Sequence, residues 1–268
     1  MGVLNVTPDS FSDGGRYLDA GAALAAARRM AAEGAAVIDV GGESTRPGAV
    51  PPDVAEELRR VVPVVRALAG ELDVVVSVDT SRAAVIEAAV AAGATFVNDV
   101  RGLSDPQALA AVARARVGVC LMHMQGEPAT MQNGPAYRDV VAEVRGWLAA
   151  RVAACRAAGI APDAIAVDPG FGFGKTAAHN LALLDALEEF TTLGAALLVG
   201  LSRKSLVGRL TGRPAGERLA GSVALAAIAA SRGAAIVRAH DVAATVDAVR
   251  VGAALRRPAA AGRAQESV

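Results

Sequence analysis

Short apolar runs alternate with longer alanine-rich segments along the chain, and each apolar run is followed by polar residues. The apolar runs are Gly2–Leu4, Ala36–Val40, Val74–Val78, Thr95–Val97, Gly118–Met122, Ala164–Val167, Ala196–Leu201 and Ala235–Val237. Runs of this length predict buried strands, and the segments between them have helical spacing. Eight such units predict an α/β fold of the (β/α)8 TIM-barrel class, whose active site lies at the carboxyl ends of the strands.

The helical segments have start and stop signals. Asp105 followed by Pro106 is an N-cap followed by a first-turn proline, and Gly159 stops the longest segment. The predicted helices are Asp19–Ala32, Pro52–Ala69, Arg82–Ala92, a segment opened by Asp105, Tyr137–Ala158, Asn180–Leu193, Lys204–Leu210 with Glu217–Arg232, and Val242–Leu255. We expect a single barrel domain over residues 1–257 and a disordered tail over 258–268.

Composition and charge narrow the class of protein. The chain has 27 basic and 27 acidic residues, a balance that argues against a general nucleic-acid or anionic-membrane binder. It has no long apolar run free of charge, so we predict no membrane span. Cys120 and Cys155 form no CxxC motif, which favours a reducing compartment. Because the first strand starts at the N-terminus and leaves no room for a signal peptide, we predict a cytoplasmic location.

Lysine is rare in this chain, since Lys175 and Lys204 are its only two lysines and all other basic residues are arginine. Both lysines come directly after predicted strands. An ammonium is a compact point charge and is chemically different from a guanidinium fork. We therefore treat both lysines as candidate functional residues.

Polar residues at four strand ends are expected to meet in the barrel mouth. Asp79, Asn98 and Asp168 offer acceptors for a flat, donor-rich heterocycle, and Lys204 offers a donor. The same four groups would also suit a metal site or a Schiff-base aldolase. Three histidines without metal-ligand spacing argue against a metal site built from protein alone. The polar neighbours of Lys204 argue against the desolvation that an aldolase lysine needs.

A second group of residues is cationic. Arg46, Arg238 and His240, with Thr45 and Asn5, would suit a phosphate or diphosphate, because arginine binds phosphate oxygens with two parallel hydrogen bonds. The amide oxygen of Asn5 could ligate Mg²⁺ while the diphosphate supplies further oxygens.

Structural roles are also open for several of these residues. Arg238 could form an ion pair with Asp241, and His240 could cap a helix. The segment Asp168–Thr176 resembles a phosphate-binding loop, but a proline stands where the first glycine is needed. Its glycines would allow a tight turn and the close approach of a flat ligand to the backbone, and Phe173 could stack on that ligand.

Eight segments, in order, resemble the dihydropteroate synthase family of pterin-binding enzymes. They are Asn5–Gly15, Gly41–Gly48, Val78–Thr80, Asn98–Asp99, Met122–Gly126, Asp168–Lys175, Ser202–Ser205 and Arg238–Asp241. The resemblance runs from residue 1 to about Ala254 and implies a (β/α)8 barrel that forms a homodimer. Family members usually carry a short N-terminal extension, which we expect to be lacking here.

The resemblance also implies a reaction, in which (7,8-dihydropterin-6-yl)methyl diphosphate condenses with 4-aminobenzoate, with Mg²⁺ as cofactor, to give 7,8-dihydropteroate and diphosphate for folate biosynthesis. By resemblance the catalytic residues are Asp79, Lys204, Arg238 and His240. The implied pterin site comprises Asp79, Asn98, Met122, Asp168, Phe173 and Lys204. The implied diphosphate site comprises Asn5, which also holds the metal, with Thr45, Arg46, Arg238 and His240. The implied aminobenzoate site, where sulfonamides also bind, comprises Thr45, Arg46, Pro47, Phe173, Lys204 and Ser205.

Two other functions are weighed against this one. A methyltetrahydrofolate-dependent methyltransferase is also a barrel but would not need the two long diphosphate-binding loops, and both are intact here. The first loop, Thr7–Arg16, follows the first predicted strand, and the second loop, Gly41–Pro52, follows the second. A catalytically silent paralogue that only binds pterin should have lost Arg46, Lys204, Arg238 or His240, and all four are present. Ser12 and Asp13 belong to the first of the two loops. The resemblance implies that this first loop closes over the aminobenzoate site.

Overall fold

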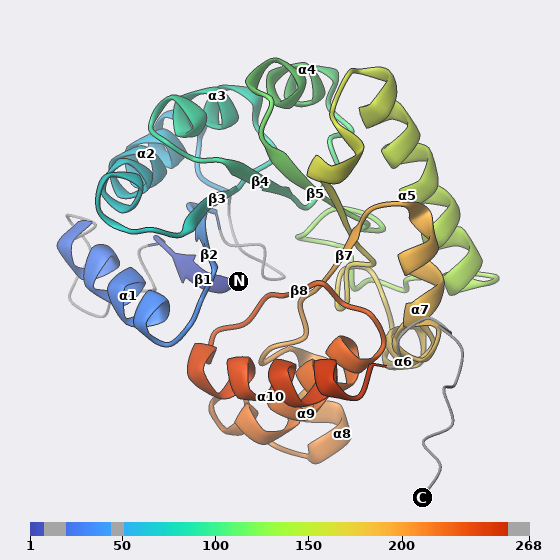
Figure 1. Ribbon diagram of the computed structural model, residues 1–268. Coiled ribbons are helices and arrows are strands. Elements are labelled where there is room, and N and C mark those ends of the chain that lie inside the picture. The colour runs from blue at the N-terminus through green and yellow to red at the C-terminus, as the bar shows by residue number, and fades with distance from the viewer. Residues whose placement is uncertain (8–19, 44–50, 257–268) are drawn as a thin grey trace, which may run out of the picture.

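Eight parallel strands form a closed ring in sequence order in the computed structural model, which describes residues 1–7, 20–43 and 51–256 (Figure 1). The strands are β1 (Gly2–Asn5), β2 (Val37–Gly41), β3 (Val75–Asp79), β4 (Phe96–Asp99), β5 (Gly118–Met122), β6 (Ile165–Asp168), β7 (Ala196–Val199) and β8 (Ile236–Val237). A parallel bridge between Gly2 and Ala239 joins the last strand to the first. The predicted (β/α)8 barrel is confirmed.

Helices surround the ring of strands (Figure 1). They are α1 (Ala20–Ala32), α2 (Val54–Glu71), α3 (Ala83–Ala91), α4 (Pro106–Ala115), α5 (Val140–Ala157), α6 (Ala177–Asp185), α7 (Leu187–Phe190), α8 (Ser205–Thr211), α9 (Leu219–Ser231) and α10 (Val242–Ala254). None of the helices in these described ranges is long and apolar enough to cross a membrane.

Capping explains where two helices differ from prediction. Helix α5 begins three residues later than predicted, because the Asp139 side chain accepts hydrogen bonds from the first backbone N–H groups of the helix. Helix α6 begins three residues earlier, because Thr176 and His179 form a capping box in which each side chain accepts from the backbone of the other.

The inside of the barrel has an apolar floor and a polar upper layer. Cys120, Ala166 and Leu198 form the floor, with Phe96 and Ile236 packed against them. Side chains two positions apart in a strand share a face, so the next inward residues toward the mouth stand above this floor. They are Asn98, Met122, Asp168, Gly200 and Arg238. The strand alternation therefore carries several of the predicted site residues to one level of the barrel.

Some predicted positions lie outside the described residues. These are Ser12 and Asp13 in the first loop, Thr45, Arg46 and Pro47 in the second, and the tail over 258–268.

Candidate functional site

An arginine held between two carboxylates lies in the barrel mouth. Arg238 Nε donates to Asp39 Oδ2 at 2.7 Å, and Arg238 Nη2 donates to Asp79 Oδ2 at 2.8 Å. The Asp39 side chain is fully buried, and that of Arg238 is 21% exposed. Strand β8 is thereby tied to β2 and β3. The alternative in which Arg238 pairs with Asp241 is wrong, since Asp241 accepts a hydrogen bond from Arg203 at 2.9 Å.

Asp39 was missed by the sequence prediction, although it joins more partners than any other carboxylate in this cluster. Its oxygens also accept from Ser77 Oγ and, at 3.0 Å, from Asn98 Nδ2. Asp39 stands inside a run that we counted as apolar, so polar residues are not confined to the strand ends. A carboxylate inside a buried strand must have partners, and that requirement was the available signal for a site residue.

Burial changes the acidity of the two predicted carboxylates. It raises the pKa of Asp79 to about 7, although the neighbouring Arg238 guanidinium acts in the opposite direction. Burial likewise raises the pKa of Asp168, against the attraction of the Lys204 ammonium. One oxygen of Asp168 accepts from Gly170 N at 2.7 Å. Both carboxyl groups are therefore buried hydrogen-bonding groups whose charged forms are disfavoured by desolvation.

Lys204 lies over an aromatic ring beside Arg238. Its Nζ is 4.6 Å from the centroid of the Phe173 ring and donates to the Phe171 carbonyl oxygen. A Cβ on Gly200 would lie 3.8 Å from Arg238 Cβ and 3.9 Å from Lys204 Nζ, so this glycine separates the two cations. Burial lowers the pKa of Lys204 to about 8. The expectation that Lys204 lacks desolvation is therefore wrong.

The glycines after β6 make room for the protein's own backbone. A Cβ on Gly170 would lie 1.9 Å from the carbonyl oxygen of His123, and one on Gly174 would lie 2.3 Å from that of Gln125. Both glycines also have positive φ, at 73° and 62°. The positive φ values agree with the tight turn that we expected of these glycines. At these two positions the β5–α5 connection occupies the space a Cβ would take, and the close approach of a flat ligand stays a prediction.

Asn5 and His240 lie at the rim of the mouth. A Cβ on Gly41 would lie 3.5 Å from Asn5 Oδ1 and 3.8 Å from Asp79 Oδ2, so the amide oxygen faces toward Asp79 across a glycine. His240 Nδ1 lies 3.1 Å from Ser202 Oγ. The N-cap of α10 is the next residue, so the helix-capping role considered for His240 is wrong. Within the described ranges, no group of three His, Cys, Asp or Glu side chains could hold a metal by itself.

Two more predicted residues lie nearby, and both are described. Met122 ends β5 and is buried, whereas Ser205 is the first residue of α8 and is exposed. Asn98, near the end of β4, is buried with its amide on Asp39. The structure thus buries Met122 and Asn98 inside the barrel and leaves Ser205 exposed at the start of α8.

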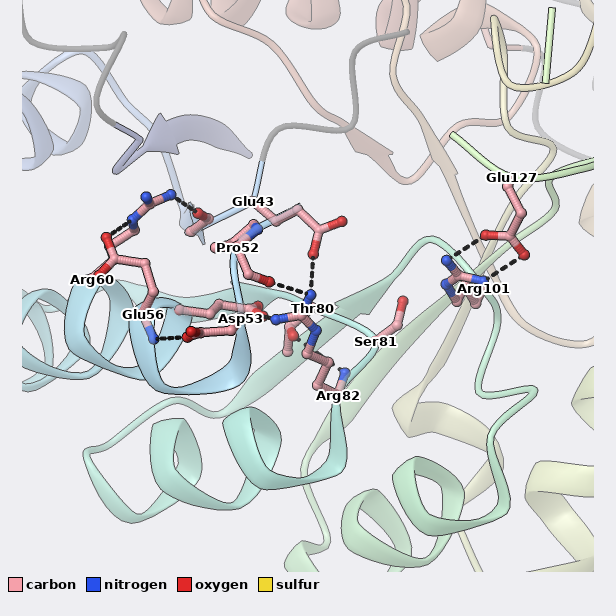
Figure 2. A network of polar contacts seen from close by, with 12 residues as sticks. Glu43, Pro52, Asp53, Glu56, Arg60, Thr80, Ser81, Arg82, Arg101 and Glu127 are labelled. Atoms are coloured by element: carbon pink, nitrogen blue, oxygen red, sulfur yellow. Dashed lines mark hydrogen bonds and ion pairs between the residues drawn. The ribbon is translucent and has the colours of Figure 1, made fainter. Parts of the chain in front are cut away.

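A pocket of about 430 Å³ opens beside Asp79. Its wall includes Arg82 and the ion pair of Arg101 with Glu127. Figure 2 shows the side chains of Arg101 and Glu127 facing each other. The pair is made by two parallel hydrogen bonds at 2.9 and 2.6 Å. Charged groups of both signs therefore line the approach to the mouth on the side of β3, β4 and β5.

Arg82 connects the two ends of the β2–α2 connection (Figure 2). Its Nη2 donates to the carbonyl oxygen of Pro52 at 2.7 Å and lies 3.2 Å from Glu43. Its Nη1 lies 2.9 Å from Glu57, a buried carboxylate on α2 whose pKa is raised by burial. Neither Arg82 nor Glu57 was singled out as a site residue from the sequence. The helical spacing places Glu57 on the solvent-exposed face of its helix, and that expectation is wrong, because the Glu57 side chain is buried.

Comparisons with known proteins agree with this architecture. The profile of the family described as pterin binding enzyme matches residues 1–240. Dihydropteroate synthase of Escherichia coli strain K12 is 53% identical over 251 residues, covering 94% of this chain and 89% of its own. The crystal structure of Yersinia pestis dihydropteroate synthase with a sulfonamide drug has a TM-score of 0.89 at 52% identity, covering 95% of this chain and 92% of its own. The Xanthomonas albilineans enzyme in complex with 7,8-dihydropteroate has a TM-score of 0.86 at 50% identity, covering 94% and 91%.

This chain belongs to the pterin-binding enzyme family. Its similarity at about half identity over most of its length is to dihydropteroate synthases, so the resemblance drawn from its motifs is confirmed.

The Asp39 carboxylate is predicted to stabilise the polar upper layer of the barrel, because it accepts hydrogen bonds from Arg238, Ser77 and Asn98. Asp39→Asn leaves Arg238 with one carboxylate and should lower the free energy of unfolding by about 3 kcal/mol, the usual cost of breaking a buried ion pair. Urea unfolding measures it. Asp185→Asn is the matched control, because Asp185 pairs with Arg232 but its side chain is 85% exposed, and it should cost about 0.5 kcal/mol or less. Equal losses in both variants would contradict the assignment.

The two lysines are predicted to differ in reactivity. At pH 8 about half of Lys204 should be the neutral amine, whereas an ordinary lysine is neutral at about 0.4%. Acetylation of Lys204, followed by peptide mass spectrometry, should therefore speed up with pH and level off above pH 8. Lys175 is only 2% exposed and should be labelled only after unfolding. A Lys204 rate that still climbs steeply at pH 10 would refute the lowered pKa.

Proposed function

We propose that this chain condenses (7,8-dihydropterin-6-yl)methyl diphosphate with 4-aminobenzoate, giving 7,8-dihydropteroate and diphosphate in folate biosynthesis. The observation that carries the proposal is the inner layer in which the carboxyl groups of Asp79 and Asp168 lie beside the cations of Lys204 and Arg238. In the reaction the amine nitrogen bonds to the pterin methylene carbon, the carbon–oxygen bond to diphosphate breaks, and the nitrogen loses a proton.

The inner layer suits the flat edge of a pterin. Asp168 keeps one oxygen beyond its contact with Gly170, and this oxygen can accept from an amino-pyrimidinone edge. Asn98 adds amide acceptor capacity, and Lys204 supplies the donor that a ring nitrogen or carbonyl needs. Buried Met122 offers an apolar, adaptable surface for one face of the ring. We therefore assign these residues to the pterin.

Charge develops in two places as the carbon–oxygen bond breaks. Positive charge on the pterin lies toward Asp79, which Arg238 holds in place. Negative charge develops on the departing diphosphate, and we assign it to His240, Asn5 and the N–H groups of Arg238 that face neither carboxylate. Because two of its nitrogens already donate to carboxylates, Arg238 serves first to orient Asp79 and second to bind diphosphate.

The aromatic amine needs positioning more than activation. An arylamine is unprotonated near pH 7, so it requires no general base to become a nucleophile. We assign 4-aminobenzoate to the ring of Phe173 and the stem of Lys204, with Ser205 and the second-loop residues Thr45, Arg46 and Pro47 around it. Binding the two substrates side by side supplies the orientation on which the rate depends. The Yersinia pestis enzyme, 52% identical to this chain, forms a complex with a sulfonamide drug, which supports the proposal that sulfonamides bind this chain too.

Mg²⁺ is part of the proposal, because Asn5 fits a weak single-ligand role. A neutral amide oxygen suits an ion that takes most of its ligands from diphosphate and water. When bound, Mg²⁺ would offset negative charge on the leaving diphosphate.

We also propose that the chain is a homodimer that contacts its partner through the outer face of α8, α9 and α10. Exposed large apolar side chains gather on these helices and just beyond α10: they are Leu210, Leu219, Ile228, Val251 and Leu255. These are five of the eight exposed large apolar side chains in the described residues, and such a concentration on neighbouring helices favours a protein interface. The cytoplasmic location stays a prediction of the sequence.

Two other functions make opposite predictions. A methyltetrahydrofolate-dependent methyltransferase would demethylate its folate substrate and would release no diphosphate. A silent pterin-binding paralogue would bind the pterin substrate without turnover. The similarity to dihydropteroate synthases and the presence of Lys204, Arg238 and His240 support the synthase over both.

Amine-dependent diphosphate release tests the proposed reaction directly. Purified protein with both substrates and Mg²⁺ should release diphosphate and form dihydropteroate only when 4-aminobenzoate is present. Lys204→Arg should lower kcat by about a hundredfold, because a guanidinium cannot reproduce the position of the ammonium. Arg209→Lys, an exposed cation exchange on α8, is the control and should leave kcat unchanged. Substrate binding without any diphosphate release would favour the silent paralogue.

His240 is predicted to discriminate the diphosphate. His240→Ala should weaken binding of the pterin methyl diphosphate by about tenfold or more, the usual effect of losing a hydrogen bond to a charged group. Binding of the corresponding hydroxymethyl pterin, which lacks diphosphate, should change little. Isothermal calorimetry with both ligands measures the difference. The same loss for both ligands would remove His240 from the diphosphate site.

A further inference from the structure

Lys175, the second lysine of the chain, is buried and fully engaged with acceptors from the protein. Its Nζ lies 3.0 Å from His123 Nδ1, 3.3 Å from the His123 carbonyl oxygen and 3.0 Å from the Phe173 carbonyl oxygen. An ammonium has three N–H groups, so these three acceptors account for its donor capacity. Because it is only 2% exposed, it is poorly placed to react with a substrate itself.

The hydrogen bond from Lys175 to Phe173 connects this lysine to the candidate site. The carbonyl oxygen of Phe173 accepts a hydrogen bond from Lys175, and the backbone N–H of Phe173 donates to Gly170 O at 3.1 Å. The Phe173 ring makes a cation–π contact with Lys204, whose Nζ lies 4.6 Å from the ring centroid. A change in the backbone at Phe173 would therefore move the surface on which the Lys204 ammonium rests.

The His123 end is fixed by the barrel. His123 donates its backbone N–H to Asp168 O at 3.0 Å, and its ring meets the edge of Trp147 at a centroid distance of 5.1 Å. Burial lowers the pKa of His123 to about 3, so its ring is neutral and Nδ1 can accept a hydrogen bond. Lys175 thus links a rigid strand end to the glycine-rich β6–α6 connection.

We propose that Lys175 is a positioning residue that, anchored on His123, fixes the Phe173 backbone and thereby holds the Phe173 ring under the Lys204 ammonium. The part of this inference that concerns substrate rests on the proposed function, because it takes Phe173 and Lys204 as the surface for 4-aminobenzoate. The geometric part does not depend on the reaction.

The presence of only two lysines makes the geometric part measurable without substrate. Protons above an aromatic ring resonate upfield, so in protein labelled with ¹³C at the lysine ε-carbon the Lys204 methylene should be displaced upfield. The spectrum is recorded at pH 6, where Lys204 is protonated, since its pKa is about 8. Phe173→Leu removes the ring and sets the undisplaced position. Lys175→Met, nearly isosteric, should move the Lys204 signal most of the way to that position.

A pair of His123 variants tests the same link while Lys175 keeps its charge. His123→Asn places an amide oxygen where Nδ1 stood and should preserve the Lys204 shift. His123→Leu removes the acceptor and should reduce the shift. Both variants should lose stability through the changed packing on Trp147, so a merely structural role would affect both alike. These variants also decide the matter if Lys175→Met does not fold.

Kinetics then tests the consequence for the reaction. Lys175→Met should raise the KM for 4-aminobenzoate by about tenfold, as expected when a binding surface is displaced by a fraction of an ångström. Binding of the pterin substrate should change little. If the Lys204 signal stays in place in Lys175→Met and His123→Leu but moves in Phe173→Leu, the positioning role is overturned whatever the activity. If the signal moves as expected but no variant, nor the parent, turns over substrate, the proposed function fails and the positioning role stands.

Discussion

The ion pair of Arg238 with Asp39 and Asp79 is the interaction on which the barrel mouth depends. A buried charge is costly unless it is paired and hydrogen-bonded. Strand β8 carries the cation, and strands β2 and β3 carry the two carboxylates. Ser77 and Asn98 complete the hydrogen bonding of Asp39. The protein's own side chains therefore hold the polar layer in place, and such preorganisation is the condition for electrostatic stabilisation of a transition state.

Burial shifts the pKa values of the acids and of the lysine in this layer in opposite directions. It raises the pKa of Asp79 to about 7 and lowers that of Lys204 to about 8, because a desolvated environment disfavours the charged form of each. The neighbouring opposite charges limit both shifts. An acid and a base with close pKa values on one surface can present donors and acceptors to a heterocycle near neutral pH.

The shape of the site depends on contacts between connections that are distant in sequence. The backbone around His123 fills the space that Gly170 leaves, and Lys175 joins the same two connections through hydrogen bonds. Phe173 and Lys204 rest on this arrangement. On the other side of the mouth, Arg82 connects the ends of the second loop through its guanidinium. Lys175 is a buried cation beneath this arrangement, whereas Arg82 is partly exposed in the wall of the pocket beside Asp79.

The sequence by itself determined the order of strands and helices, the positions of Asp79, Asp168 and Lys204 at or just after the carboxyl ends of strands, and the family. These follow from periodicity and from motifs that are local in the chain. Only the tertiary structure decided that Asp39 is the common partner of the layer and that Lys175 has no free donor. Such contacts depend on which residues of distant strands face the same interior level, and on burial, which no local pattern specifies.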